Sequence, residues 1–247
     1  MQLIDPALSA PAEILAVDEA LLDWCETGGS GELLHFWEPR EPFVVVGYAN
    51  KVATEVNVPA CAAAGIPIFR RCSGGGTVVQ LPGGLNYSLI LQITADGPTR
   101  NITAANQFIM ERNRAAIELA ANSVNNSALA ASISVRGHTD LCAGNVKFAG
   151  NSQRRHRNFL LFHGTLLLNC NLALISEYLR MPSLQPDYRA GRPHSDFVTN
   201  LPLPAAAVKT AFAKTWHAVP AKLDLPREKV CRLAQDKYAT HAWNFKF

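Results

Sequence analysis

Apolar positions along this chain repeat with two different periods. Apolar residues three or four positions apart predict amphipathic helices over residues 12–26 and 102–121. The same spacing predicts further helices over residues 172–179, 205–218 and 227–238. The predicted helices thus flank segments of the chain that have a different pattern.

Those segments carry short apolar runs that are typical of strands. Residues 139–143 and 146–150 flank a Gly-Asn turn pair and so predict a hairpin. A further strand is predicted over residues 159–162. Strands and helices follow one another without regular β–α–β alternation. This order favours an α+β fold, in which helices pack against a mixed, largely antiparallel sheet.

Two segments show neither period. Residues 122–131 are small and polar, so they are predicted to form a loop. Residues 182–204 contain five prolines and little periodicity. Loops of this kind cover the active site in enzymes with mobile lids, and we expect residues 182–204 to have such a place.

The composition limits the classes of protein to which the chain can belong. The chain has 247 residues, of which 48% are apolar and 17% charged, values expected for one compact domain over residues 1–247. A net charge of +3 is too small to indicate nucleic-acid binding. No apolar run reaches the ~18 residues of a membrane span. The amino terminus lacks a signal-peptide pattern, and the six cysteines show neither zinc spacing nor a Cys-x-x-Cys pair. We therefore expect a cytoplasmic protein without a bound metal, a nucleic-acid partner or a membrane.

The densest candidate chemistry lies in residues 70–79, which read Arg-Arg-Cys-Ser-Gly-Gly-Gly-Thr-Val-Val. Three consecutive glycines weaken a strand, so they indicate that something approaches the backbone too closely for a Cβ atom. The arginines add fixed positive charge suited to a phosphate or carboxylate. This pattern favours a backbone site for an anion, although a glycine-rich hairpin with two solvated arginines fits it too.

A second candidate region follows the predicted hairpin. Lys147 is a lone cation among apolar residues, and a small polar run at residues 150–153 comes directly after it. His163 and Gly164 end the next predicted strand. A lysine in such a place can simply extend to the surface. Together with the glycines, however, these residues predict one site at the ends of neighbouring strands.

These motifs, in this order and spacing, resemble those of the lipoate-protein ligase A and octanoyltransferase family. The resemblance rests on Arg-x-Ser-Gly-Gly-Gly-Thr-Val, the downstream Leu-Asn-Tyr-Ser, Lys-Phe-Ala-Gly-Asn-Ser-Gln and His-Gly-Thr-Leu-Leu. It extends over nearly the whole chain. It implies the fold of a class II synthetase-like biotin/lipoate ligase catalytic domain.

The resemblance also implies a reaction. Ligases of the family use ATP with Mg²⁺ to convert lipoate or octanoate into an acyl-adenylate, because a carboxylate is a poor acylating agent. They then transfer the acyl group to a lysine of a lipoyl domain. The expected acceptors are the lipoyl domains of 2-oxoacid dehydrogenase complexes or the glycine cleavage H protein.

Roles for individual residues follow from the same resemblance. Lys147 is expected to be catalytic, neutralising charge at the acyl carbonyl and phosphate. Arg71 would lie along the acyl-adenylate, and Trp37 would form an aromatic wall. Substrate positioning, rather than a nucleophilic triad, is expected to carry catalysis. The full set of expected substrate-binding residues is Trp37, Arg71, Ser73, Gly74, Gly75, Gly76, Thr77, Asn86, Gly150, Asn151, His163 and Gly164.

The cysteines bear on the choice between ligase and transferase. Octanoyltransferases of the family carry the acyl group on a cysteine as a thioester. The loop expected to hold that cysteine corresponds to residues 131–134, which contain none. Cys142, five residues before Lys147, is the nearest candidate nucleophile, and Cys72 is a weaker one. Cys142 is expected to be a structural residue, since free cysteines commonly pack as small hydrophobic groups.

Three readings of the activity stay open. The family's bacterial ligases commonly carry a C-terminal accessory domain, which is expected to be absent here. The chain is then a self-sufficient ligase, a ligase completed by a separate accessory-domain protein, or a transferase that receives a preformed acyl group. A biotin-protein ligase and a non-catalytic module that binds lipoyl domains are less favoured alternatives. The basic run at residues 154–157 is expected to be a solvated loop, with contact to an acidic lipoyl domain or acyl carrier protein as the alternative.

Overall fold

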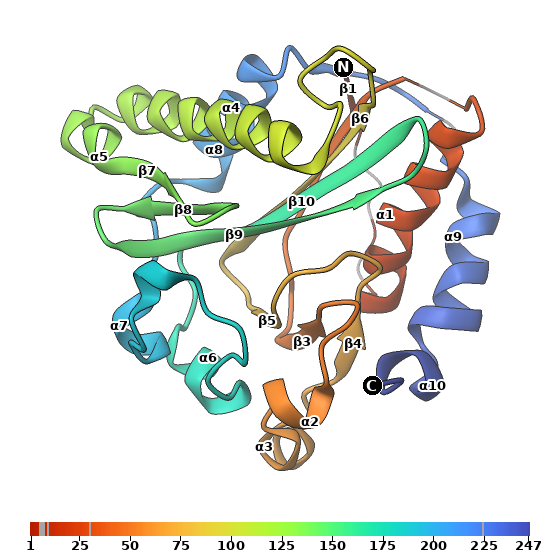
Figure 1. The fold of residues 1–247 in the computed structure, drawn as a ribbon, viewed down its shortest axis with the longest axis vertical. Helices are drawn as coiled ribbons and strands as arrows, with labels where there is room; N and C mark the ends of the chain where they lie inside the picture. The colour runs from red at the N-terminus through yellow and green to blue at the C-terminus, as the bar shows by residue number, and fades with distance from the viewer. Residues whose placement is uncertain (5–7, 9, 30, 224) are drawn as a thin grey trace.

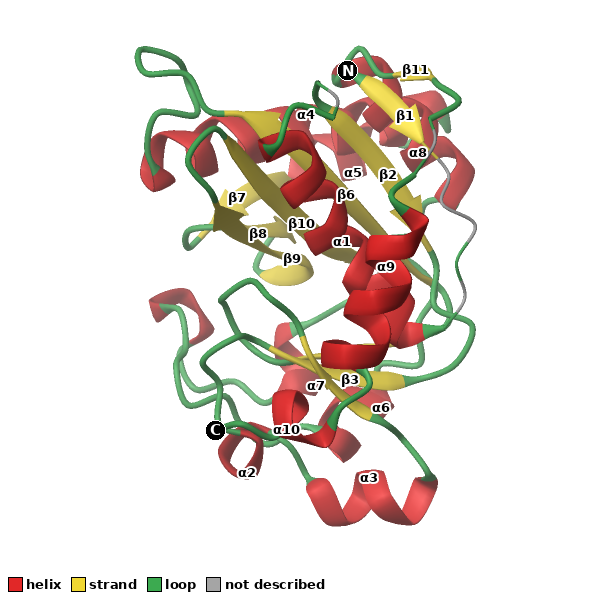
Figure 2. Ribbon diagram, turned by 90° about the vertical axis from the view of Figure 1, so that its right-hand side faces the viewer, coloured by secondary structure: helices red, strands yellow, loops and turns green. Residues whose placement is uncertain are grey.

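The computed structural model describes residues 1–4, 8, 10–29, 31–223 and 225–247. It contains two sheets that lie one above the other (Figure 2). The larger sheet has eight strands in the order β11-β1-β2-β6-β10-β9-β8-β7, and the smaller has three in the order β4-β3-β5. The central strands of the larger sheet pair antiparallel, whereas β1 is parallel to β2 and to β11. The predicted α+β class with a mixed, largely antiparallel sheet is confirmed.

The strands are mostly short. Those of the larger sheet are β1 (Gln2–Ile4), β2 (Leu33–Trp37), β6 (Gly84–Gln92), β7 (Ile133–Arg136), β8 (Asp140–Ala143), β9 (Val146–Arg155), β10 (Phe159–Leu167) and β11 (Val219–Pro220). Those of the smaller sheet are β3 (Phe43–Val46), β4 (Ile68–Arg70) and β5 (Val78–Gln80).

Helices cover both faces of the larger sheet (Figure 1). Helices α4 and α8 pack against one face, and α1 with α9 behind it packs against the other. The helices are α1 (Pro11–Glu26), α2 (Val52–Glu55), α3 (Val58–Ala64), α4 (Ile102–Ser123), α5 (Ser127–Ser132), α6 (Ala173–Tyr178), α7 (His194–Phe197), α8 (Ala205–Thr215), α9 (Arg227–Leu233) and α10 (His241–Asn244). A 3₁₀ turn, η1 (Asp187–Arg189), and a π turn, η2 (Ala234–Tyr238), complete the set.

Strand β6 contributes side chains to two hydrophobic cores, one on each face of the larger sheet. Its side chains alternate between faces, so Tyr87 and Leu89 join the cluster under α4, whereas Ile90 joins the cluster under α1. Every residue of β6 except Gln92 is buried. Leu89, Ile90 and Leu91 form the continuous apolar run expected of a strand buried on both faces, whereas Asn86 and Ser88 are buried polar positions on the face toward α1.

Two local expectations are wrong. Residues 122–131 are not all loop, because the Asn126 side chain accepts the Leu129 N–H and caps the short helix α5. Residues 182–204 contain η1 and α7 rather than loop alone. The predicted helix over residues 227–238 is confirmed, as α9 followed directly by the π-helical η2.

The basic run is likewise not a solvated loop at its first two positions. Strand β9 continues past the predicted hairpin and pairs with β10 as far as Arg155. Arg154 donates to the carbonyl of Cys72 at 2.8 Å, and Arg155 donates to the carbonyl of Thr99 at 2.8 Å. Both guanidinium groups therefore hold loops against the sheet, a use of arginine that the charge pattern alone does not reveal.

Candidate active site

The register of the larger sheet aligns polar side chains on the face toward α1. Paired residues on neighbouring strands point to the same face, and His35, Ser88, His163 and Ser152 form one such row. The next row is Trp37, Asn86, Thr165 and Gly150. We define the polar seam as the hydrogen-bonded groups between this face, α1 and the smaller sheet: Asp18, His35, Ser73, Gln80, Asn86, His163 and Thr165.

One half of the polar seam is a chain of hydrogen bonds centred on Asp18 of α1. One carboxylate oxygen of Asp18 lies 2.9 Å from His35 Nε2, and the other lies 2.6 Å from His163 Nδ1. The second ring nitrogen of His163, Nε2, lies 2.6 Å from Ser73 Oγ. Ser73 Oγ in turn accepts from Arg71 Nε at 3.0 Å. Helix α1, strands β2 and β10 and the segment after β4 are therefore linked, directly or through His163, to the buried carboxylate of Asp18.

Asp18 is ionised in this setting. Burial by itself raises the pKa of Asp18, but hydrogen bonds from His163 and His35 and the attraction of their charge outweigh that effect. The pKa of Asp18 therefore lies well below its ordinary value. An ionised carboxylate only accepts hydrogen bonds, so both histidines donate to it.

The other half of the seam links the two sheets. Asn86 Nδ2 donates to Gln80 Oε1 at 3.0 Å, and Gln80 Nε2 donates to Thr165 Oγ1 at 3.0 Å. Thr165 closes the ring by donating to Asn86 Oδ1 at 2.5 Å. Asn86 is therefore where it was expected, but its amide is engaged by Gln80 of the smaller sheet.

Arg71 organises the glycine loop, which we define as residues 73–77. Its guanidinium donates to the carbonyl of Gly74 at 2.6 Å and to that of Gly76 at 2.8 Å. Burial lowers the pKa of Arg71 to about 10. The buried charge is thus satisfied by carbonyls of the loop that it shapes.

The conformation of the glycine loop requires glycine at position 75 and in the neighbouring turn at position 47. Gly75 has a φ of +80°, and a Cβ there would lie 3.0 Å from Arg71 Nη2. A Cβ at Gly47, in the turn after β3, would lie 2.1 Å from the Gly75 carbonyl oxygen. Across the described ranges, no protein acceptor lies within hydrogen-bonding reach of the amides of Gly74, Gly75 and Gly76. Successive free amides suit an anionic group.

Lys147 lies beside the second row of the seam. A Cβ added to Gly150 would lie 2.9 Å from Lys147 Nζ, so the lysine side chain passes over this glycine. Lys147 Nζ is 2.7 Å from Asp140 Oδ1, and its side chain is 26% exposed. Asp140 Oδ2 accepts from Tyr188 at 2.7 Å. A partly exposed ammonium group held by one carboxylate can neutralise negative charge on a ligand.

The proline-rich segment lies against Lys147. Besides Tyr188, it contributes Val198, which forms a parallel bridge with Lys147, and Thr199, whose amide donates to the Lys147 carbonyl at 2.9 Å. Burial, and then the charges of Arg189 and Lys147, lower the pKa of His194 to about 4. His194 is therefore neutral at pH 7.

Cys142 has no base to take its proton. Its thiol is buried, and burial raises its pKa. Its nearest partner is the Tyr188 hydroxyl at 3.6 Å, which itself donates to Asp140. A thiol in this setting stays protonated, which agrees with a structural role.

The structure does not bring all the expected residues together. Asn151 lies on the opposite face of the sheet, where it donates to the Thr139 carbonyl at 2.7 Å and accepts from Tyr87 at 2.5 Å. Gly164 leaves room there, since a Cβ on it would lie 1.7 Å from Asn151 Oδ1. Trp37 lies on the seam face and stacks on Phe43 with ring centroids 6.2 Å apart. Thr77 donates to Asn50 at 3.2 Å and so anchors the end of the glycine loop.

Sequence reasoning missed Asp18, His35, Gln80 and Thr165. The sequence does indicate that Asp18 is unusual, because this carboxylate lies on the apolar, buried side of an amphipathic helix. His35 lies inside a short apolar strand and is fully buried. Ionisable groups are rarely buried without a partner, so each of these positions predicts another polar group nearby.

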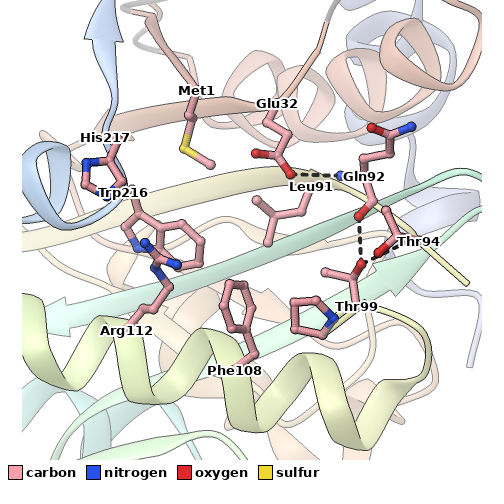
Figure 3. Close-up of a pocket in the computed structure, with 11 residues that line it drawn as sticks. Met1, Glu32, Leu91, Gln92, Thr94, Thr99, Phe108, Arg112, Trp216 and His217 are labelled. Carbon is pink, nitrogen blue, oxygen red and sulfur yellow. Dashed lines mark hydrogen bonds between the residues drawn. The ribbon is translucent and has the colours of Figure 1, made fainter. Parts of the chain in front are cut away.

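A surface hollow of about 420 Å³ lies elsewhere, between α4, the end of β6 and the turn after α8 (Figure 3). Its apolar lining includes Phe108 and Trp216. Arg112 lies against both rings and donates to the Thr215 carbonyl at 3.1 Å, so its charge is already engaged. No residue expected at the active site lines this hollow.

No helix in the described part of the chain is long and apolar enough to cross a membrane. All six cysteines are free thiols.

Comparison with known proteins finds relatives of two enzyme classes. An octanoyltransferase LipM from Geobacillus kaustophilus is 27% identical and aligns over 98% of this chain and 97% of its own length. Lipoate–protein ligase 1 from Staphylococcus aureus is also 27% identical, over 83% of this chain and 62% of its own.

Solved structures share the fold. A lipoate protein ligase of Thermoplasma acidophilum with bound lipoic acid has a TM-score of 0.74 and 22% identity, covering 100% and 98% of the two chains. A bi-partite ligase from that organism, described with its E2 lipoyl domain, has a TM-score of 0.73 and 21% identity over 99% and 95%. A lipoate-protein ligase A bound with ATP has a TM-score of 0.74 and 22% identity over 99% and 98%.

Both enzyme classes thus occur among the relatives. The family model of the lipoyl protein ligase A/B catalytic domain matches residues 10–215, and the chain belongs to this family.

Proposed function

We propose that this chain is a lipoate-protein ligase, which activates lipoate or octanoate with ATP and transfers the acyl group to a lysine of a lipoyl domain. The observation that carries the proposal is the combination of a partly exposed ammonium, Lys147, with three amides of the glycine loop that have no protein acceptor among the described residues. An acyl-adenylate presents a carbonyl and a phosphate a few bonds apart, and these two features suit them.

The chemistry has two steps. The carboxylate of lipoate attacks the α-phosphate of Mg-ATP, pyrophosphate leaves, and a mixed anhydride with AMP forms. The acceptor lysine amine then attacks the acyl carbonyl, and AMP leaves. Lys147 would stabilise the negative charge that develops on the carbonyl oxygen in the second step. Asp140 and Tyr188 would hold the Lys147 ammonium in place.

Two neighbouring structures support the choice of substrates. One ligase of this fold binds lipoic acid and another binds ATP. A further neighbour is described together with its E2 lipoyl domain, which supports a lipoyl domain as the acceptor. That acceptor would belong to a 2-oxoacid dehydrogenase complex or to the glycine cleavage H protein. Free thiols in every cysteine fit a reducing cytoplasm.

An octanoyltransferase is the second candidate. The full-length alignment with an octanoyltransferase LipM favours it. The state of Cys142 disfavours it, because a buried, protonated thiol is a poor acyl carrier.

The test compares acyl donors with an apo lipoyl domain as acceptor and its mass as readout. One reaction holds lipoate or octanoate with Mg-ATP, a second holds octanoyl-acyl carrier protein without ATP, and a third holds preformed lipoyl-adenylate. We expect modification in the first and third reactions. Modification by the octanoyl carrier alone would overturn the ligase in favour of the transferase. Modification by lipoyl-adenylate alone would mean that a separate protein carries out activation.

A further inference from the structure

Asp18 lies at the buried end of a chain of contacts that leads to the glycine loop. Its carboxylate lies 2.6 Å from His163 Nδ1, and His163 Nε2 lies 2.6 Å from Ser73 Oγ. Ser73 Oγ also accepts from Arg71 Nε at 3.0 Å. Asp18 and Ser73 are 4% and 1% exposed, so these contacts are made out of reach of bulk water. They link the position of one carboxylate on α1 to the first residue of the loop.

The same contacts set the direction of the loop amides. The Gly74 carbonyl accepts from Arg71 Nη2 at 2.6 Å and from Ser152 Oγ at 2.8 Å. A trans peptide is planar, so its N–H points opposite to its C=O. The Gly75 amide shares the peptide of this carbonyl and therefore points away from both side chains. Across the described ranges it has no protein acceptor, so it is free for a ligand.

Glu19, the next residue of α1, provides a contrast. It is buried too, and its carboxylate accepts from Lys237 Nζ at 2.7 Å and from the Tyr238 hydroxyl at 2.6 Å. These contacts hold α1 against η2. Of two neighbouring carboxylates on one helix, Glu19 thus serves helix packing, whereas Asp18 is connected to a loop with free amides.

We propose that Asp18 is a positioning residue for binding of the acyl-adenylate: by holding His163 and Ser73, it keeps the amides of the glycine loop aimed at the phosphate. The inference rests on the proposed function, which supplies the ligand. Asp18 acts through its neighbours, and its own carboxylate meets no reacting atom. A loop that is already ordered binds its ligand without a further entropic cost, so Asp18 contributes to affinity more than to the rate of transfer.

Replacing Asp18 by asparagine keeps the shape of the side chain and removes its charge. The carboxylate uses one oxygen for His35 and the other for His163, whereas an amide offers a single accepting oxygen. One of the two histidines therefore loses its acceptor, and the His163 ring is no longer fixed against Ser73. Loss of a hydrogen bond to a charged group commonly changes an equilibrium by about tenfold or more.

The experiment measures affinity and rate separately. Calorimetric titration with a non-hydrolysable sulfamoyl analogue of lipoyl-adenylate gives the affinity, and transfer from saturating lipoyl-adenylate to an apo lipoyl domain gives kcat. Asp18→Asn should bind the analogue about tenfold more weakly and keep kcat within about threefold of wild type. Glu19→Gln is the matched control and should bind the analogue like wild type, even where thermal melting shows an equal loss of stability.

A second substitution tests the chain of contacts itself. His163→Gln interrupts it between Asp18 and Ser73, so adding Asp18→Asn to His163→Gln should weaken binding no further. If Asp18→Asn does not fold, His163→Gln decides alone: weaker binding with kcat retained supports the inference, and wild-type affinity overturns it.

Three other results would overturn the inference and leave the ligase standing. They are wild-type affinity in Asp18→Asn, an equal loss of affinity in Glu19→Gln, and fully additive losses in the double variant. A wild-type protein that binds no analogue would instead overturn the proposed function, and the inference with it.

Discussion

Cys142 and Ser73 are both buried near the same face of one sheet, yet their surroundings differ. Cys142 is five residues from Lys147, and within the described part of the chain its hydrogen-bond partner is a tyrosine hydroxyl already bound to Asp140. Ser73 is far from Lys147 in sequence, and it contacts a histidine that is hydrogen-bonded to an ionised aspartate. The comparison teaches that the partners brought together by the fold, and not closeness to Lys147 along the chain, decide the setting of a side chain.

The largest effect is expected at Lys147. Lys147→Ala should reduce modification of the lipoyl domain by about 10²-fold or more, because a preorganised cation at a developing oxyanion is lost. The rate is measured with saturating lipoyl-adenylate, so that activation does not enter. Lys147→Arg serves as the charged control. Near-normal transfer by Lys147→Ala would remove the lysine from the mechanism.

The glycine loop offers the next test. Gly75→Val forces a branched side chain into a left-handed backbone beside Arg71, so binding of lipoyl-adenylate should weaken by about tenfold or more, the factor that corresponds to about 1.4 kcal/mol. Gly31→Ala is the control, because Gly31 lies outside the glycine loop and a Cβ there would meet no atom within 4 Å. Calorimetric titration of both variants gives the affinities. Equal binding by the two would show that the loop does not contact the ligand.

A smaller effect is expected where Tyr188 and Asp140 hold Lys147. Tyr188→Phe removes one hydrogen bond to a charged group, a contact worth about 1.5–3 kcal/mol, so transfer should fall by roughly tenfold. The loss should appear in kcat with lipoyl-adenylate, while affinity for ATP stays unchanged. A Tyr188→Phe variant as slow as Lys147→Ala would mean that the tyrosine takes part in the chemistry itself.

Asp18 makes the stability of the fold depend on pH. Since its pKa is lower in the folded chain than in the unfolded one, the unfolded chain binds more protons as the pH falls below about 4. Stability from this group is complete above that pH and is lost in acid. The free energy of unfolding, measured by urea titration from pH 6 to 3, should therefore fall more steeply for wild type than for Asp18→Asn. The difference in slope should reach up to about 1.4 kcal/mol per pH unit. Parallel slopes would contradict the ionised state of Asp18.

The smallest effect is expected at Cys142. Cys142→Ser should change lipoyl transfer by less than about twofold, since the thiol is protonated and has no base. Activity with each acyl donor is measured beside Ser73→Ala. Loss of octanoyl transfer in Cys142→Ser alone would contradict the structural role of Cys142 and favour the transferase.

Periodicity sufficed for the long helices and the hairpin, because α1, α4, β8 and β9 have strong local patterns. It failed at α5 and α7, which depend on a cap and on tertiary packing. For the site, motif order singled out Lys147, Ser73, His163 and the glycines, and their role in the site stays a prediction. The hydrogen-bond chain through Asp18 could not be predicted, because it joins strands and a helix whose register only the folded sheet fixes.

The central claim is that one site, between Lys147 and the glycine loop, holds the acyl-adenylate. A crystal structure with a non-hydrolysable sulfamoyl analogue of lipoyl-adenylate tests it most directly. We expect the acyl carbonyl of the analogue within hydrogen-bonding distance of Lys147 Nζ and its sulfamoyl group at the amides of Gly74, Gly75 and Gly76. An analogue bound in the hollow beside Phe108 and Trp216 (Figure 3), with Lys147 and the glycine loop free of it, would contradict the account.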